Sequence, residues 1–109
     1  MVETLTASEI AELLSHGAEV VDVRDPDEWA AGHIPGARLV PLDELRADVE
    51  AALPRHDSIV FVCARGVRSL SAAKLAARFG YTHVYNLDGG TTAWAKAGLP
   101  IEATARAAA

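Results

Sequence analysis

A run of four apolar residues, Ile59-Val60-Phe61-Val62, limits the possible folds of this chain more than any other segment. Successive side chains of a β-strand point to opposite faces of the sheet, so a strand that is apolar throughout must be covered on both faces. Helices packed on both sides of a parallel sheet provide that cover. The run therefore predicts a central strand in an α/β fold.

Strand and helix patterns alternate along the rest of the chain. Further strands are predicted near Leu5 and over residues 19–23, 38–40 and 84–87, and helices over about 6–17, after 25, over 43–52 and 69–79, and around Trp94. Two helix starts carry a capping box, formed by Thr6 with Glu9 and by Asp25 with Glu28. This alternation predicts an α/β sandwich of three layers, with helices on both sides of a mostly parallel sheet.

The length of 109 residues fits one domain, which we expect to span residues 1–102, with a frayed tail over 103–109. Half of the residues are apolar and 23% are charged, a balance that excludes intrinsic disorder. The lone cysteine, Cys63, excludes a disulfide scaffold. The formal net charge of -5 argues against nucleic acid or an anionic membrane as a partner.

Neither a membrane span nor a bound metal is expected. No stretch approaches the roughly 20 consecutive apolar residues that cross a bilayer, and the first residues lack the basic and apolar segments of a secretory signal. The histidines lack the spacing of metal ligands, so no cofactor is predicted; they are His16, His33, His56 and His83. We expect a protein of the reducing cytoplasm, where a single thiol stays free.

Cys63 stands directly after the apolar strand and before a helix, in the loop Ala64-Arg65-Gly66-Val67-Arg68. Ligands of open α/β sheets bind at such a carboxyl end of a strand. The helix N-terminus, the N–H groups of a curled loop and the charges of Arg65 and Arg68 all favour a thiolate over a thiol. Gly66 suits a tight loop because it tolerates a positive φ. The loop is therefore predicted to hold a reactive thiol.

The alternative is that Cys63 is an inert residue at the end of a buried strand, because free cysteine is often buried. Two arginines and a glycine within five residues weigh against this interpretation. A structural role is an equal alternative for Arg68, through bonds to loop carbonyls, to Asp22 or to Glu28. Arg65 is harder to explain as a structural residue.

Three stretches, spread over nearly the whole chain, form a set of motifs in a fixed order. They are Val21-Asp22-Val23-Arg24-Asp25 continuing through Glu28-Trp29 to Gly32-His33-Ile34-Pro35-Gly36-Ala37, then Cys63-Ala64-Arg65-Gly66-Val67-Arg68-Ser69, then Asn86-Leu87-Asp88-Gly89-Gly90 with Trp94. In these stretches the chain resembles the rhodanese-type sulfurtransferases in their single-domain form. The resemblance implies a five-stranded sheet of order 1-5-4-2-3, with the cysteine loop after the fourth strand.

The same resemblance implies a transfer of sulfur. The Cys63 thiolate would take the outer sulfur of thiosulfate or of a persulfide donor, hold it as a persulfide, and pass it to cyanide or a thiol. Arg65 stands where a cationic residue meets the anionic donor. The implied substrate-binding residues are those of the loop, Ala64, Arg65, Gly66, Val67, Arg68 and Ser69. With no second cysteine to form a disulfide, the sulfur must leave on an external small-molecule or protein acceptor.

Two observations bear on the substrate. Similar-looking protein phosphatases place an arginine six residues after the nucleophile, whereas Ser69 stands there in this chain, so the shorter loop favours sulfur over phosphate. The segment Asp25-Pro26-Asp27-Glu28 is acidic where some two-domain relatives that use thiosulfate carry an arginine, which counts against efficient use of thiosulfate. A persulfide carrier or interaction module that serves partner proteins is the second hypothesis.

The remaining conspicuous residues are expected to be structural. Asp22 and Arg24 suit an ion pair or a hydrogen-bond network beside the cysteine loop. His33 lies in a shaped turn, and an acidic thiol needs no general base, so we expect this histidine to make structural hydrogen bonds. Trp29 and Trp94 suit core or loop packing.

Overall fold

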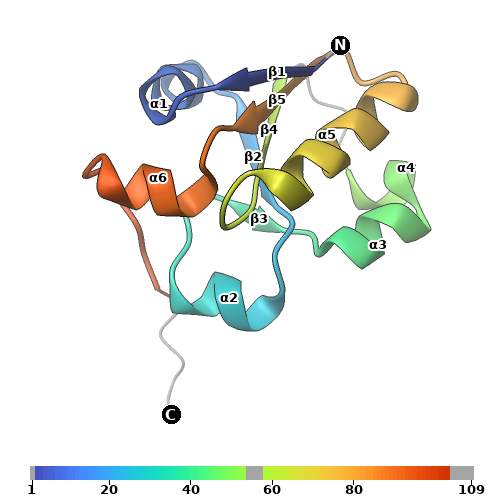
Figure 1. Ribbon diagram of the computed structural model, residues 1–109. Helices are drawn as coiled ribbons and strands as arrows, with labels where there is room; N and C mark the ends of the chain where they lie inside the picture. The colour runs from blue at the N-terminus through green and yellow to red at the C-terminus, as the bar shows by residue number, and fades with distance from the viewer. Residues whose placement is uncertain (1, 54–57, 104–109) are drawn as a thin grey trace.

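Five strands form one parallel sheet in the computed structural model, which describes residues 2–53 and 58–103 (Figure 1). The strands are β1 (Val2–Leu5), β2 (Glu19–Asp22), β3 (Arg38–Leu39), β4 (Ser58–Val62) and β5 (His83–Leu87). Their order is β1-β5-β4-β2-β3, and each neighbouring pair runs parallel. The predicted α/β class, the strand order and the central place of the apolar strand are confirmed.

Helices cover both faces of the sheet (Figure 1). On one face lie α1 (Ala7–Ser15) and α6 (Gly90–Lys96), and on the other lie α3 (Leu42–Ala47), α4 (Val49–Ala52) and α5 (Val67–Arg78). The short helix α2 (Pro26–Ala31) follows β2 and lies beyond the end of the sheet. The cysteine loop, between β4 and α5, opens at that same end because all five strands run in one direction.

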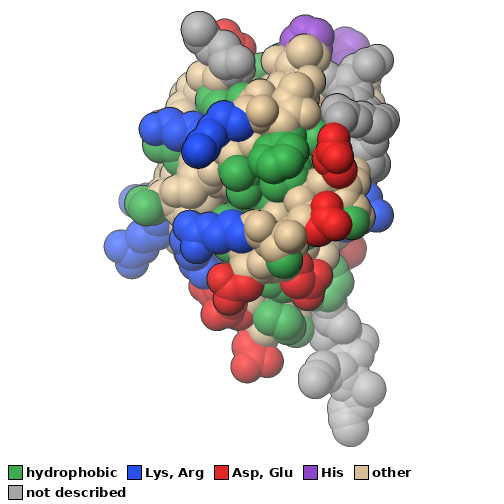
Figure 2. Space-filling model, turned by 90° about the vertical axis from the view of Figure 1, so that its right-hand side faces the viewer, with side chains coloured by type: hydrophobic (Ala, Val, Ile, Leu, Met, Phe, Trp, Pro, Cys, Tyr) green, Lys and Arg blue, Asp and Glu red, His purple; other side chains and the backbone are tan. Residues whose placement is uncertain are grey.

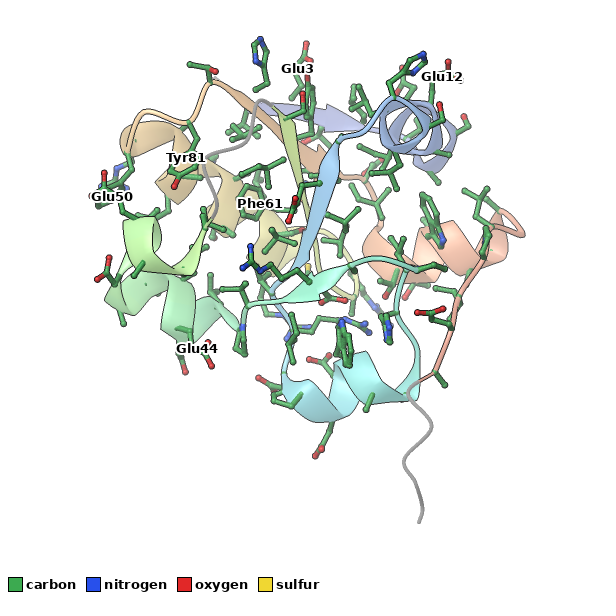
Figure 3. All side chains as sticks on the ribbon, turned by 180° about the vertical axis from the view of Figure 1, so that it is seen from behind. Glu3, Glu12, Glu44, Glu50, Phe61 and Tyr81 are labelled. Carbon is green, nitrogen blue, oxygen red and sulfur yellow. The ribbon has the colours of Figure 1, made fainter. Side chains whose placement is uncertain are left out.

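The central strand β4 separates two clusters of core side chains. Ile59 and Phe61 face the cluster under α3, α4 and α5, whereas Val60 and Val62 face the cluster under α1 and α6. All four are buried, as the apolar pattern predicts. Figure 3 shows Phe61 in the middle of the molecule, while the labelled glutamates project from its edges. Cys63 belongs to the same cluster as Phe61, so strand alternation directs the thiol toward α5.

The single helix predicted over residues 43–52 is wrong, because the segment forms two helices that meet at Asp48. Asp48 has an extended backbone (φ -162°, ψ 94°), and its carboxylate accepts a hydrogen bond from the Ala51 N–H at 3.1 Å, which caps α4. An aspartate side chain that bonds the nearby backbone competes with continuation of a helix. Helix α5 also begins at Val67, two residues before the predicted start.

Charged side chains are unevenly spread over the surface. Figure 2 shows the face that carries α3, α4 and α5, where Lys and Arg gather on one side and Asp and Glu below and on the other, with hydrophobic side chains between them. Within the described ranges, no helix is both long and apolar enough to cross a membrane. The domain limit at residue 102 stays a prediction, and residues 104–109 of the predicted tail lie outside the described residues.

Candidate active site

Gly66 gives the cysteine loop its tight curve. It precedes α5 with φ at +94°, in the left-handed region that glycine adopts without strain. A Cβ atom at this position would lie 3.2 Å from the Leu87 carbonyl oxygen and 3.3 Å from the Gly89 nitrogen. Backbone conformation and lack of space therefore both call for glycine, and the expected positive φ is confirmed.

The curved loop directs hydrogen-bond donors at the buried sulfur of Cys63. Sγ accepts hydrogen bonds from the Gly66 N–H at 3.1 Å and from the Ser69 N–H at 3.3 Å. The Ser69 hydroxyl lies 3.3 Å from the same sulfur. These donors match the expectation that the loop and the start of α5 would cradle an anionic sulfur.

The surroundings of Cys63 lower the pKa of its thiol. Burial is the largest single influence and acts in the opposite direction, because it disfavours the charged thiolate. Hydrogen bonds from the Ser69 hydroxyl and from the backbone N–H groups of Ser69, Arg65 and Gly66 together outweigh it. The thiol is thus more acidic than an ordinary cysteine, as the sequence predicts.

Asn86, on β5, is hydrogen-bonded to two residues of the cysteine loop and of the start of α5. Its side-chain oxygen accepts a hydrogen bond from the Ser69 hydroxyl at 2.5 Å, and its amide nitrogen donates to the Gly66 carbonyl at 3.2 Å and to the Thr4 hydroxyl at 3.4 Å. Ser69 and Asn86 are both buried. A residue on the neighbouring strand therefore positions both Gly66 and Ser69, whose N–H groups donate to the sulfur.

The start of α6 packs directly against the peptide that joins Cys63 to Ala64. Gly90 has φ at +61°, and a Cβ atom there would lie 2.3 Å from the Cys63 carbonyl oxygen. The N–H groups of Thr91 and Thr92 donate to the carbonyls of Cys63 and Ala64 at 2.8 and 3.2 Å. Glycine at position 90 thus lets α6 approach closely enough to donate hydrogen bonds to the backbone carbonyls of the cysteine loop.

The two arginines of the loop have different surroundings. Arg68 forms a two-pronged ion pair with Glu28 of α2, with nitrogen–oxygen distances of 2.9 and 3.0 Å. The Arg68 guanidinium lowers the pKa of Glu28 to about 2. Arg65 is exposed, and its side chain makes no hydrogen bond or ion pair to any residue the structure describes. The structural role that was one alternative for Arg68 is confirmed, and of the partners expected for it Glu28 is the one found.

Asp22 and Arg24 form the predicted ion pair beside the loop. The Arg24 guanidinium bonds both carboxylate oxygens of Asp22, at 2.9 and 2.8 Å, and also donates to the Gly32 carbonyl at 2.7 Å. Both side chains are buried. The pair joins the end of β2 to the segment after α2, which is a structural role.

His33 is also structural. Its ring stacks on that of Trp29, with centroids 3.8 Å apart, and its Nδ1 bonds the Trp29 carbonyl at 2.8 Å. Trp94 is buried and donates its ring N–H to the Pro100 carbonyl at 2.7 Å. The described residues contain no group of three metal-ligating side chains, and His56 lies outside them.

Residues 6–97 match the family of proteins with a Rhodanese-like domain. The chain belongs to that family. A rhodanese-like domain thus explains the order of the strands and the place of the cysteine loop after the fourth of them. The resemblance seen in the three sequence motifs is confirmed.

Two curated relatives of this rhodanese-like domain carry names that describe sulfur transfer. Thiosulfate sulfurtransferase GlpE of Pseudomonas aeruginosa is 38% identical over 92 residues, which are 84% of this chain and 83% of GlpE. A protein of Allochromatium vinosum named sulfurtransferase is 35% identical over 94% of this chain and 97% of its own length. The family is therefore that of the rhodanese-like sulfurtransferases.

One similar solved structure has another suggested activity. RPA3614 of Rhodopseudomonas palustris, a protein of unknown function described as a possible tyrosine phosphatase, superposes with a TM-score of 0.82 at 37% identity. The alignment covers 93% of this chain and 85% of RPA3614. In this rhodanese-like domain the sixth residue after Cys63 is Ser69, which is buried and hydrogen-bonded to the thiol, so no cation occupies that position.

From the sequence, Asn86 and Gly90 are recognised only as parts of a motif, without a role in the site. The structural role of Asn86 could have been predicted, because a polar amide inside the strand His83–Leu87 must find hydrogen-bond partners if it is buried. The role of Gly90 could not, because the peptide it contacts lies 26 to 27 residues earlier in the chain. Close approaches of this kind depend on the tertiary fold.

Proposed function

We propose that this chain is a sulfurtransferase that moves a sulfane sulfur through a persulfide on Cys63. The observation that carries the proposal is a buried thiol with a lowered pKa, which accepts two backbone hydrogen bonds at the carboxyl end of the central strand. A thiolate, not a thiol, is the attacking species. The fold thus prepares the nucleophile without a general base.

In the first step the Cys63 thiolate attacks the outer sulfur of the donor. With thiosulfate, a new S–S bond forms on Cys63, the S–S bond of the donor breaks, and its electron pair leaves with sulfite. With a persulfide R–S–SH, the same exchange leaves the thiolate R–S⁻. We assign Arg65 to the anionic donor, because its side chain is exposed and unpaired among the described residues.

In the second step an external acceptor removes the sulfur. Cyanide or a thiolate attacks the outer sulfur of the Cys63 persulfide, forms thiocyanate or a new persulfide, and releases the Cys63 thiolate. The chain has no second cysteine to compete for this step. The loop from Ala64 to Ser69 surrounds the sulfur, and its N–H groups stabilise the anionic persulfide.

The test measures thiocyanate formation from thiosulfate and cyanide, with Cys63→Ser as the comparison. The wild-type chain should turn over by double displacement, and Cys63→Ser should be inactive. Mass spectrometry after exposure to thiosulfate or glutathione persulfide should show an addition of about 32 Da, the mass of one sulfur atom, on Cys63. Equal rates for the two chains, with no such addition, would exclude the proposal.

The second candidate function is a persulfide carrier that partner proteins load and unload. The exposed Val67, an apolar side chain at the mouth of the loop, favours a protein contact there. A carrier would gain the sulfur adduct but turn over small acceptors poorly. Either function calls for a reducing compartment such as the cytoplasm, where the thiol stays free.

A further inference from the structure

The ion pair between Glu28 and Arg68 removes a cation from the donor site. The carboxylate holds the guanidinium by two hydrogen bonds, at 2.9 and 3.0 Å, across 40 residues of sequence. Glu28 is itself fixed, because its Oε1 also accepts a hydrogen bond from the Asp25 N–H at 3.0 Å. The paired carboxylate neutralises the guanidinium, so an anionic donor gains little attraction from Arg68 while the pair is intact.

A second ion pair near the loop is neutral in the same way. Asp22 neutralises Arg24 in a buried pair, as Glu28 neutralises Arg68. Arg68 lies near enough to Cys63 and to Asp25 for both negative charges to act on it. Of the two loop arginines, only Arg65 is left without a carboxylate among the described residues. The loop around the thiolate therefore carries one arginine whose positive charge no described carboxylate neutralises.

A doubly charged donor such as thiosulfate is poorly matched to the charges around the cysteine loop. Thiosulfate carries two negative charges toward a thiolate that already carries one, and a single exposed arginine compensates only part of the repulsion. A protonated persulfide R–S–SH carries no charge on the sulfur atoms that react. Its attack by the thiolate costs no such repulsion.

We propose that Glu28 is a specificity-determining residue, which neutralises Arg68 and so favours an uncharged persulfide over dianionic thiosulfate. This inference rests on the proposed transfer of sulfur through Cys63. In the preferred reaction the Cys63 thiolate bonds to the outer sulfur of R–S–SH, the S–S bond of the donor breaks, and R–S⁻ leaves. Charge and atoms balance without any further reactant.

The experiment measures the rate at which Cys63 gains sulfur from two donors, thiosulfate and the persulfide of 2-mercaptoethanol, at a mildly acidic pH where part of the persulfide is in the uncharged form R–S–SH. Glu28→Gln keeps the oxygen that caps α2 but removes the charge that holds Arg68. We expect loading from thiosulfate to rise about tenfold, the effect of roughly one charge-assisted hydrogen bond. Loading from the uncharged persulfide should change less than twofold.

Two variants separate the freed arginine from a general change of charge. Asp27→Asn removes an exposed carboxylate from the same turn of α2, and loading from thiosulfate should stay within twofold of wild type. The double variant Glu28→Gln, Arg68→Gln loses both charges, and its loading from thiosulfate should stay within twofold of that of Arg68→Gln alone, because no arginine is left for the change at position 28 to free. The proposal is overturned if either variant gains as much over its reference as Glu28→Gln gains over wild type, or if Glu28→Gln speeds both donors alike.

A measurement on the wild-type chain does not depend on the folding of any variant. Raising the ionic strength from about 0.02 to 0.5 M weakens attraction and repulsion between separated charges. Because the net interaction of thiosulfate with the site is repulsive, its rate of loading should stay constant or rise with salt, whereas a fall of tenfold or more would overturn the inference. If wild type gains sulfur from neither donor, the proposed function itself fails, and that result is distinct from an unchanged preference.

Discussion

Ser69 donates its hydroxyl proton to the Asn86 side chain at 2.5 Å while its oxygen lies 3.3 Å from the sulfur of Cys63. A serine hydroxyl carries one proton, so it donates to the amide oxygen or to the thiolate, but not fully to both. The Asn86 amide cannot turn over to relieve this competition, because its nitrogen already donates to the Gly66 carbonyl. The acidity of the thiol therefore depends on a residue that does not touch it.

Replacing Ser69 by alanine should raise the pKa of the Cys63 thiol, because the hydroxyl is the strongest of the groups that lower it. The rate of alkylation by iodoacetamide against pH measures this, since the thiolate is the reactive form. The wild-type profile should have its midpoint below about 8.5, the value of a free cysteine, and the variant should move toward that value. Ser71→Ala, at an exposed position of the same helix, is the control. A Ser69→Ala profile identical to wild type would contradict the assigned role of the hydroxyl.

Replacing Asn86 by alanine should have the opposite effect on the thiol. The Ser69 hydroxyl loses its competing acceptor and donates to the thiolate, so the alkylation midpoint should move below that of wild type. The free energy of unfolding should fall by about 2 kcal/mol, because the part-buried Gly66 carbonyl and the buried Ser69 hydroxyl lose a partner. Denaturant titration measures this loss. An alkylation midpoint above wild type would show that Asn86 acts by holding the loop instead.

Gly90→Ala should destabilise the chain by about 3 kcal/mol or more. Its Cβ would lie 2.3 Å from the Cys63 carbonyl oxygen, so α6 or the cysteine loop must move, and the left-handed backbone adds strain. Gly80→Ala is the matched control, because φ is +91° there but no atom lies within 4 Å of the new Cβ. That control should lose only about 1 kcal/mol, the cost of the backbone conformation. Equal losses in the two variants would rule out the contact with Cys63 as the cause.

The stabilising effect of Glu28 should depend on pH. Its pKa is about 2 in the folded chain against an ordinary value of 4.5, so the folded state binds the proton more weakly than the unfolded state. The contribution to stability is therefore complete above about pH 4.5 and is lost as the pH falls through 2. The difference in unfolding free energy between wild type and Glu28→Gln should shrink over that window, as denaturant titrations at several pH values will show. A difference that stays constant down to pH 2 would contradict the pairing with Arg68.

Local chemistry was enough to predict the layers of this fold and the position of the thiol. The four apolar residues of β4 are buried only if helices cover both faces of the sheet. Gly66 indicated a tight loop, because glycine adopts a positive φ without strain. Asp48 shows the limit of this reasoning, because the same residue type is tolerated on the surface of a helix and also starts a new one. Only its own bond to the Ala51 N–H decides between the two.

The sequence by itself determined where the thiol lies in the fold, because strand, cysteine, glycine and helix follow one another within a dozen residues. Only the tertiary structure decided which charges and donors act on that cysteine. Glu28 lies 40 residues before Arg68, and Asn86 lies 17 residues after Ser69. The strand order 1-5-4-2-3 brings these residues to the cysteine loop. The central strand β4 lies between β5 and β2, and because the strands are parallel, the segments that follow all three lie at the same end of the sheet. Electrostatic and hydrogen-bond effects act over a few ångströms of space, and no local pattern of residues records that distance.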